Sequence, residues 1–108
     1  MTGIDQTRKA RLESAGWRVG DAAEFLGLTP EEAAFVELKL ALASYLREVR
    51  RSRGWTQVQV AVLLGSSQSR VAKMEAADST VSVDLLVRSL LRLGATREEV
   101  GRAIARAA

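Results

Sequence analysis

The sequence predicts an all-α fold, and three of its features support this class. Apolar residues make up 47% of the 108 residues and aromatic residues only 5%, so one small core must be built from Leu, Val and Ala. Helix-forming residues dominate, and the chain has a single proline. Capping patterns and glycines recur at short intervals along the chain, which predicts five to six helices joined by short connections.

The N-terminal part of the chain is expected to hold an arm and a short helix. Residues 1–16 are polar and charged without periodicity, which predicts a flexible arm, and residues 17–108 are expected to form one domain. Residues 21–24 have the spacing of a capping box, and they predict a short helix that Gly27 closes. Trp17 lies in a poorly patterned stretch, where it could anchor the arm on the core or meet a partner.

A longer helix is predicted over residues 30–53. Thr29 can cap it, proline suits its first position, and Gly54 ends it. Val36 and Leu40 lie off its main apolar stripe, so this wider apolar surface suggests a second contact with a twin subunit or another protein. The stripe itself is expected to contain Phe35, Leu38, Leu42, Tyr45, Leu46 and Val49.

Four shorter helices are predicted after this long one. Residues 56–59 form a capping-box pattern and open a helix that Gly65 ends. Ser67 can cap the next helix, which runs to about residue 76, and Ser82 opens a leucine-rich helix. Residues 96–99 form another capping box, which predicts a last helix near the C-terminus.

Charge is distributed unevenly along the chain. Residues 47–74 hold six basic residues against one acidic residue, a net charge of +5, whereas residues 13–46 have a net charge of −4. A solvated arginine-rich surface would explain the basic block by itself. Its overlap with residues 56–76, where the two central helices meet, favours a nucleic acid as the partner.

Several classes of protein are excluded or disfavoured by composition. The chain has no Cys and no His, so it cannot form disulfides or metal sites with thiolate or imidazole ligands, and no cofactor is predicted. No stretch approaches the roughly 20 apolar residues of a membrane span. The first residues lack the apolar segment of a secretory signal, so a cytoplasmic, nucleoid-associated location is expected.

Residues 56–76 have the pattern of two helices that cross at a steep angle through a short turn. Ala61 supplies the small residue that a close crossing needs, and Gly65 supplies a residue that tolerates positive φ in the turn. The rotation of 100° per residue places Ser69 and Lys73 on the outer side of the second helix, with Arg70 beside them. The inward positions are expected to be Val60, Leu64, Val71 and Met74.

This segment resembles the Xre/Cro family of helix-turn-helix repressors, whose DNA-binding domain is lambda repressor-like. The resemblance covers roughly residues 38–93. Residues 16–45, followed by this motif and by SVDLLVRSLLRLG, are also similar to the HigA-type antitoxins. In that group such a chain represses its own operon as a dimer and neutralises a ribonuclease toxin of the RelE/HigB type. The residues that match the Xre/Cro spacing are Gln57, Ala61, Gly65, Val71 and Glu75.

The resemblance implies contacts with DNA from polar residues at the start of both motif helices and along the second. Gln68 matches a base-reading position, and a Gln side chain suits the N6 and N7 edge of adenine. Arg70 could read guanine or grip a phosphate, and Lys73 could serve as a phosphate anchor as well as a base reader. Each of them could also be an ordinary exposed polar residue. The expected set is Gln57, Ser67, Gln68, Ser69, Arg70 and Lys73.

Two further features follow from the resemblance. Arg50 and Glu75 match positions that form an internal ion pair in the family, and the alternative is two exposed charges. Val62 and Leu63 depart from the family pattern, which usually has a polar residue at one or both positions. We expect this pair to be surplus core, with a contact surface as the alternative.

The function expected from these observations is repression by occupancy. A homodimer would place two recognition helices about 34 Å apart on a palindromic operator in double-stranded DNA. The alternatives are a stand-alone Xre-family regulator without a toxin, or an interaction module that mainly binds a toxin through its arm and residues 17–46. An enzyme is not expected, because the adjacent acid pairs at 31–32 and 98–99 lie at helix starts and residues 66–67 lie in the turn.

Overall fold

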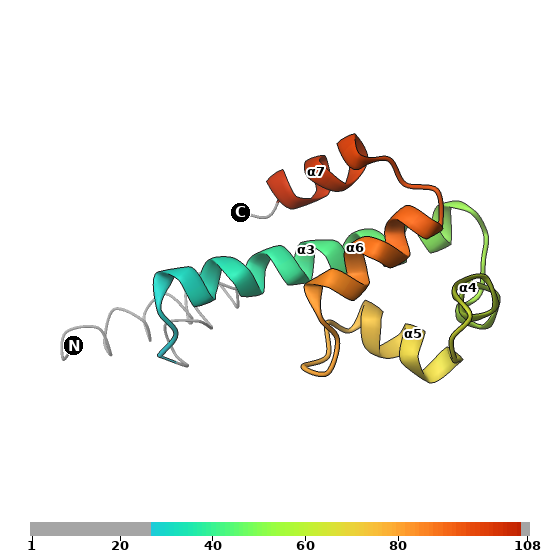
Figure 1. Cartoon of the computed structure of the whole chain (residues 1–108), viewed down its shortest axis with the longest axis horizontal. Helices are drawn as coiled ribbons and strands as arrows, with labels where there is room; N and C mark the ends of the chain where they lie inside the picture. The colour runs from blue at the N-terminus through green and yellow to red at the C-terminus, as the bar shows by residue number, and fades with distance from the viewer. Residues whose placement is uncertain (1–26, 107–108) are drawn as a thin grey trace, which may run out of the picture. The chain divides into compact units, whose positions relative to one another are not determined.

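The computed structural model describes residues 27–106, and this part of the chain contains five helices and no strand (Figure 1). It confirms the all-α class. The arm expected over residues 1–16, the helix expected at 21–24 and Trp17 all lie outside the described residues. By its internal contacts the chain forms two units, with the boundary after Glu37. The helices are α3 (Pro30–Ser52), α4 (Gln57–Leu64), α5 (Gln68–Glu75), α6 (Val83–Arg92) and α7 (Arg97–Ala105).

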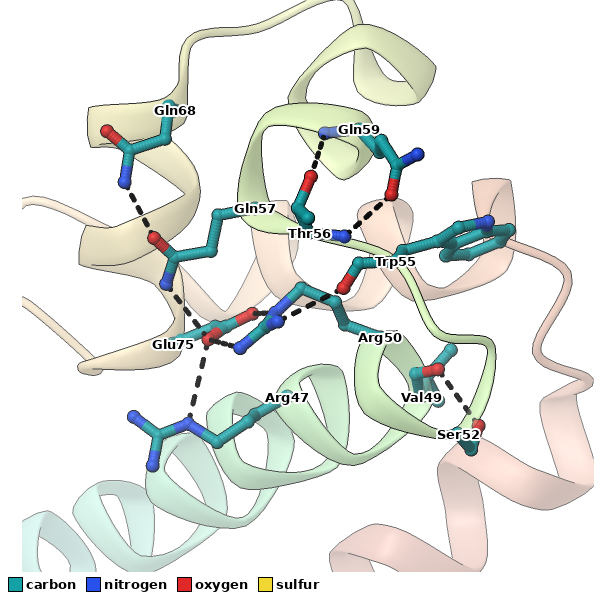
Figure 2. A network of polar contacts seen from close by, with 10 residues as sticks. All are labelled: Arg47, Val49, Arg50, Ser52, Trp55, Thr56, Gln57, Gln59, Gln68 and Glu75. Atoms are coloured by element: carbon teal, nitrogen blue, oxygen red, sulfur yellow. Dashed lines mark hydrogen bonds and ion pairs between the residues drawn. The ribbon is translucent and has the colours of Figure 1, made fainter.

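Reciprocal hydrogen bonds begin three of these helices. At α3 the backbone N–H of Thr29 donates to the Glu32 carboxylate at 2.8 Å, and the Glu32 N–H donates to the Thr29 hydroxyl at 3.1 Å. Thr96 and Glu99 make the same pair of bonds at α7. A third capping box opens α4 (Figure 2). One acid of each adjacent pair, at 31–32 and 98–99, therefore caps a helix, as the sequence predicted.

The turn between α4 and α5 depends on Gly65. This residue has φ 64° and ψ 40°, a left-handed conformation that an L side chain adopts only with strain. A Cβ added there would meet no atom within 4 Å, so backbone conformation alone, and not space, favours glycine. The bend lets the N–H of Ser66 donate to the carbonyl of Ala61 at 2.8 Å, and α5 begins two residues later.

A single core lies within residues 38–106. Leu42 and Leu46 of α3 are fully buried together with residues of α4, α5 and α6. The predicted inward positions of the motif are confirmed, because Val60, Val71 and Met74 are buried and Leu64 packs against the core. The largest fully buried side chains are Leu42, Leu46, Met74, Leu86, Leu90, Val60, Val71 and Val81.

Two expectations about burial are wrong. Val62 is 76% exposed and Leu63 is 44% exposed, so this pair is not surplus core. The inward positions of α4 are taken by Val60 and Ala61, so Val62 and Leu63, on other sides of this short helix, are left at the surface. Phe35, assigned to the inward stripe of α3, is exposed in the segment before Leu38.

The five described helices also answer the question of membrane spans. None of them combines the length and the apolar character that crossing a bilayer requires.

Candidate nucleic-acid interface

The two motif helices meet through small and apolar residues. Ala61 on α4 and Val71 on α5 are both buried, and Gly65 provides the bend between them. Since α4 and α5 contact each other along this inner side, the opposite side of α5 is left to solvent. The arrangement is that of a helix-turn-helix unit, with α5 in the place of the outward-facing second helix (Figure 1).

An ion pair at the base of this unit joins α3 to α5. The Arg50 guanidinium donates through Nη2 to Glu75 Oε1 at 3.0 Å and through Nε to Glu75 Oε2, a bidentate contact. The Glu75 side chain is 1% exposed and the Arg50 side chain 15%. Arg50 also donates to the carbonyl of Trp55 at 3.1 Å, and Arg47 lies 3.6 Å from Glu75 Oε1 (Figure 2). The pair expected from the family positions is therefore present, and it ties α3, the segment before α4, and α5 together.

The environment of Glu75 keeps its carboxyl ionised. Burial raises the pKa of this carboxyl, but hydrogen bonds from Arg50 and Gln57 and the charges of Arg50 and Arg47 outweigh burial. The pKa consequently lies below its ordinary value of 4.5. The hydrogen bond to Glu75 correspondingly raises the pKa of Arg50, against the opposing effect of burial. At neutral pH the site holds one carboxylate beside the guanidinium groups of Arg50 and Arg47.

A relay of two glutamines extends from the ion pair to the tip of α5. Gln57 Nε2 donates to Glu75 Oε1 at 3.2 Å, and Gln68 Nε2 donates to Gln57 Oε1 at 2.7 Å (Figure 2). An ionised carboxylate can only accept hydrogen bonds, so the amide nitrogen of Gln57 must face it. The amide oxygen of Gln57 then faces Gln68 and requires a donor there. The charge of Glu75 therefore fixes the orientation of both amides.

The outward side of α5 carries the polar residues that the sequence singled out. Gln68, Ser69, Arg70 and Lys73 are all exposed. Ser67 caps the helix, because its hydroxyl accepts from the backbone N–H of Arg70 at 3.2 Å, and it lies 3.3 Å from the Ser69 hydroxyl. The structure thus brings five of the six expected side chains together around the first turns of one helix.

The sixth expected residue, Gln57, lies at the start of α4 and is only half-exposed. Sequence reasoning placed it against DNA but missed its two bonds to Glu75 and Gln68, which lie 18 and 11 residues away. The only local signal was that a glutamine occupies the first position of each motif helix. The geometry gives Gln57 a positioning role, and a direct contact with DNA stays a prediction.

The basic run at the end of α3 serves more than one purpose. Arg53 stacks over the Trp55 ring at 5.3 Å and donates to the carbonyl of Leu93 at 3.2 Å, so it stabilises the fold. Arg50 is occupied by Glu75. Arg51 is exposed and contributes positive potential, whereas the charge of Arg47 is partly offset by Glu75, 3.6 Å away.

Comparison with known proteins supports the interpretation of this geometry. The sequence model of a family described as a helix-turn-helix domain matches residues 41–104, which is more than half of the chain. No curated protein and no solved structure matches. Among the described residues, no group of three or more Asp or Glu side chains could hold a metal ion.

Proposed function

Because this chain belongs to the helix-turn-helix domain family, we propose that it is a sequence-specific transcriptional repressor of the Xre/Cro group. Helix-turn-helix domains bind DNA by placing their second helix in the major groove. The proposal depends on one observation about α5: its inner side, with Val71 and Met74, is buried, while its outer side is exposed, polar and basic. Repression would follow from occupancy of an operator.

Gln68 is the residue best placed to read a base. Its bond to Gln57 uses one amide N–H, so the second N–H and the amide oxygen stay available. These are the donor and acceptor that adenine requires at N7 and N6. The relay to Glu75 holds the Gln68 amide in one orientation, so its free N–H and its oxygen are already presented together. Binding to adenine would then cost less side-chain entropy.

The remaining side chains of the set divide between bases and phosphates. Ser69 and Lys73 share the outer side of α5 and would meet base edges, while Arg70 would meet guanine or a phosphate. Ser67 lies at the N-terminus of α5, where unpaired backbone N–H groups attract anions. Phosphate contacts would supply most of the affinity and make it sensitive to salt.

A homodimer is proposed because one α5 covers only part of a specific site. Two copies related by a twofold axis would place their α5 helices in successive major grooves about 34 Å apart. The operator would then be a palindrome, and DNA upstream of the gene is the first candidate. Analytical ultracentrifugation of the chain with such a duplex should show two copies on each duplex.

The decisive test is a double substitution, Arg70→Ala with Lys73→Ala. Both residues are exposed, so the melting temperature should stay within a few degrees of the parent while specific binding to the upstream duplex is lost. The matched control is Arg97→Ala with Arg102→Ala, which removes the same charge from exposed positions on α7. Retained operator affinity in the first variant, measured by fluorescence anisotropy, would refute the assignment.

We further propose that the repressor is the antitoxin of a pair with a RelE/HigB-type ribonuclease. The supporting observation is that Leu40, within the stretch 17–46, is a large apolar residue exposed on α3. Contiguous exposed apolar patches mark protein–protein contact sites, and we propose that this part of α3 contributes to such a patch. Leu40→Glu should abolish co-purification with the product of a neighbouring toxin gene, whereas Val62→Glu should not. A gene without a ribonuclease neighbour would leave a stand-alone regulator.

A further inference from the structure

A hollow lies beside the turn that joins α4 and α5. We call it the turn hollow; its volume is about 470 Å³, within the range of roughly 300–1,000 Å³ that is usual for small-ligand sites. The turn itself forms one wall through Gly65 and Ser66, and residues of α5 and α6 form the others. The DNA-binding role proposed above uses only Arg70 from this wall.

Arginines dominate the rim of the turn hollow. Arg70 comes from α5, and Arg88 and Arg92 come from α6 one helical turn apart. Arg92 Nε donates to the carbonyl of Leu63 at 3.1 Å, which fixes its orientation. Arg88 Nη1 lies 3.4 Å from the Asp84 carboxylate, in a well-exposed pair that contributes little. The rim therefore carries a net positive charge, which favours the binding of an anion.

The floor of the hollow is different in character. Leu64, Met74 and Leu85 line it with apolar surface, and Ser89 lies among them. Ser89 is 6% exposed, and it is part of the lining of the hollow. Buried hydroxyls are almost always paired, because leaving one unpaired costs free energy. A hydroxyl in this position is placed to bond to whatever fills the hollow.

We propose that the turn hollow binds a phosphate group attached to an apolar carbon body. The guanidinium forks of Arg70 and Arg88 match phosphate oxygens, and the Ser89 hydroxyl supplies one more donor. The carbon body lies on the leucine and methionine floor. Two sources provide this chemistry: a free organic phosphate, or a phosphodiester of bound DNA with its sugar. The first source does not depend on the proposed repressor function, whereas the second rests on it, and a free ligand in the hollow would compete with DNA for Arg70.

The first experiment titrates phenyl phosphate into the ¹⁵N-labelled chain without DNA and follows amide shifts. Phenol and inorganic phosphate, at matched ionic strength, carry the two halves of the probe separately. Phenyl phosphate should shift the amides of Gly65 and Ser66 and bind at least tenfold more tightly than either half. Arg88→Gln and Ser89→Ala should each weaken binding severalfold, whereas Arg97→Gln, an exposed arginine of α7, should not.

A second experiment distinguishes the two sources. If DNA supplies the phosphate, phenyl phosphate leaves the spectrum unchanged, but Arg88→Gln lowers the salt slope of duplex binding by about 1. Equal binding of inorganic and phenyl phosphate would overturn the proposal, and so would an unchanged spectrum together with an unchanged slope. Failure of the chain to bind any duplex would refute the repressor assignment and leave the titration without DNA fully interpretable.

Discussion

Replacing Glu75 by glutamine tests the buried ion pair directly. The substitution keeps the shape of the side chain and removes its charge, which leaves the Arg50 guanidinium, 15% exposed, without its partner. Removing one partner of a buried pair costs about 3–5 kcal/mol. Arg50 keeps its bond to the Trp55 carbonyl, and the amide oxygen of a glutamine still accepts, so we expect a loss near the lower end, about 3 kcal/mol.

A loss of this size is large for so small a domain. Domains are typically stable by about 5–15 kcal/mol, so the variant would keep only part of its stability. Each kcal/mol shifts the midpoint of a domain of 60–100 residues by roughly 4–8 °C, which predicts a fall of more than 10 °C. Thermal and urea unfolding at pH 7, followed by circular dichroism, measure it. Glu98→Gln is the control, because Glu98 is exposed on α7. An unchanged melting temperature in Glu75→Gln would refute the reasoning.

The same carboxyl should also make stability depend on pH. Because the folded protein holds the pKa of Glu75 below its ordinary value of 4.5, the stabilisation is complete above pH 4.5 and disappears as the pH falls through the folded pKa. Glu75→Gln should therefore flatten the acid limb of the stability profile. If both proteins lose stability in parallel below pH 4.5, the depressed pKa of Glu75 is not its cause.

Three further predictions use single substitutions. Gly65→Ala should lower the free energy of unfolding in urea by about 1–2 kcal/mol, because residue 65 has a positive φ. Gly101→Ala, within α7, should instead raise it by about 0.5–1 kcal/mol. Equal effects of the two substitutions would contradict this account. Gln57→Leu should keep the bonds between Arg50 and Glu75, lower stability through the lost hydrogen bond to Glu75, and lower operator affinity chiefly for adenine at the base that Gln68 reads, as anisotropy on single-base variants would show. Val62→Ser should leave the free energy of unfolding nearly unchanged, because this side chain is exposed. A loss of more than about 1 kcal/mol would mean that the side chain is covered.

The helix boundaries could be predicted from the sequence because they are encoded locally. A Thr followed three residues later by Gln or Glu closes its own pair of hydrogen bonds, as Thr56 and Thr96 do. The bend at Gly65 is equally local. The burial of Val71 and Met74 followed from helical periodicity, since polar residues lie opposite them on α5.

The rest depends on contacts that no local pattern encodes. In α4 the periodicity is nearly absent, because six of its eight residues are apolar, so the sequence could not decide which of them would be exposed. The glutamine relay joins residues 57, 68 and 75, whose proximity exists only after α4 and α5 have crossed. Phe35 lies on the apolar stripe of α3 but is exposed. Helical periodicity predicts which side of α3 faces the core, but it does not predict how far along the helix other elements pack against that side.

The relay links the stability of the domain to its proposed base recognition. Glu75 holds α3 against α5 through Arg50, and the same Oε1 that Arg50 contacts accepts from Gln57. A change at Glu75 or Arg50 therefore alters folding and the orientation of Gln68 together, so binding data on such variants cannot isolate recognition. The two roles separate at Gln57, which is half-exposed and contributes no charge to the pair. Operator binding by Gln57→Leu, measured at a temperature where the variant is fully folded, would show whether the orientation of Gln68 matters to affinity.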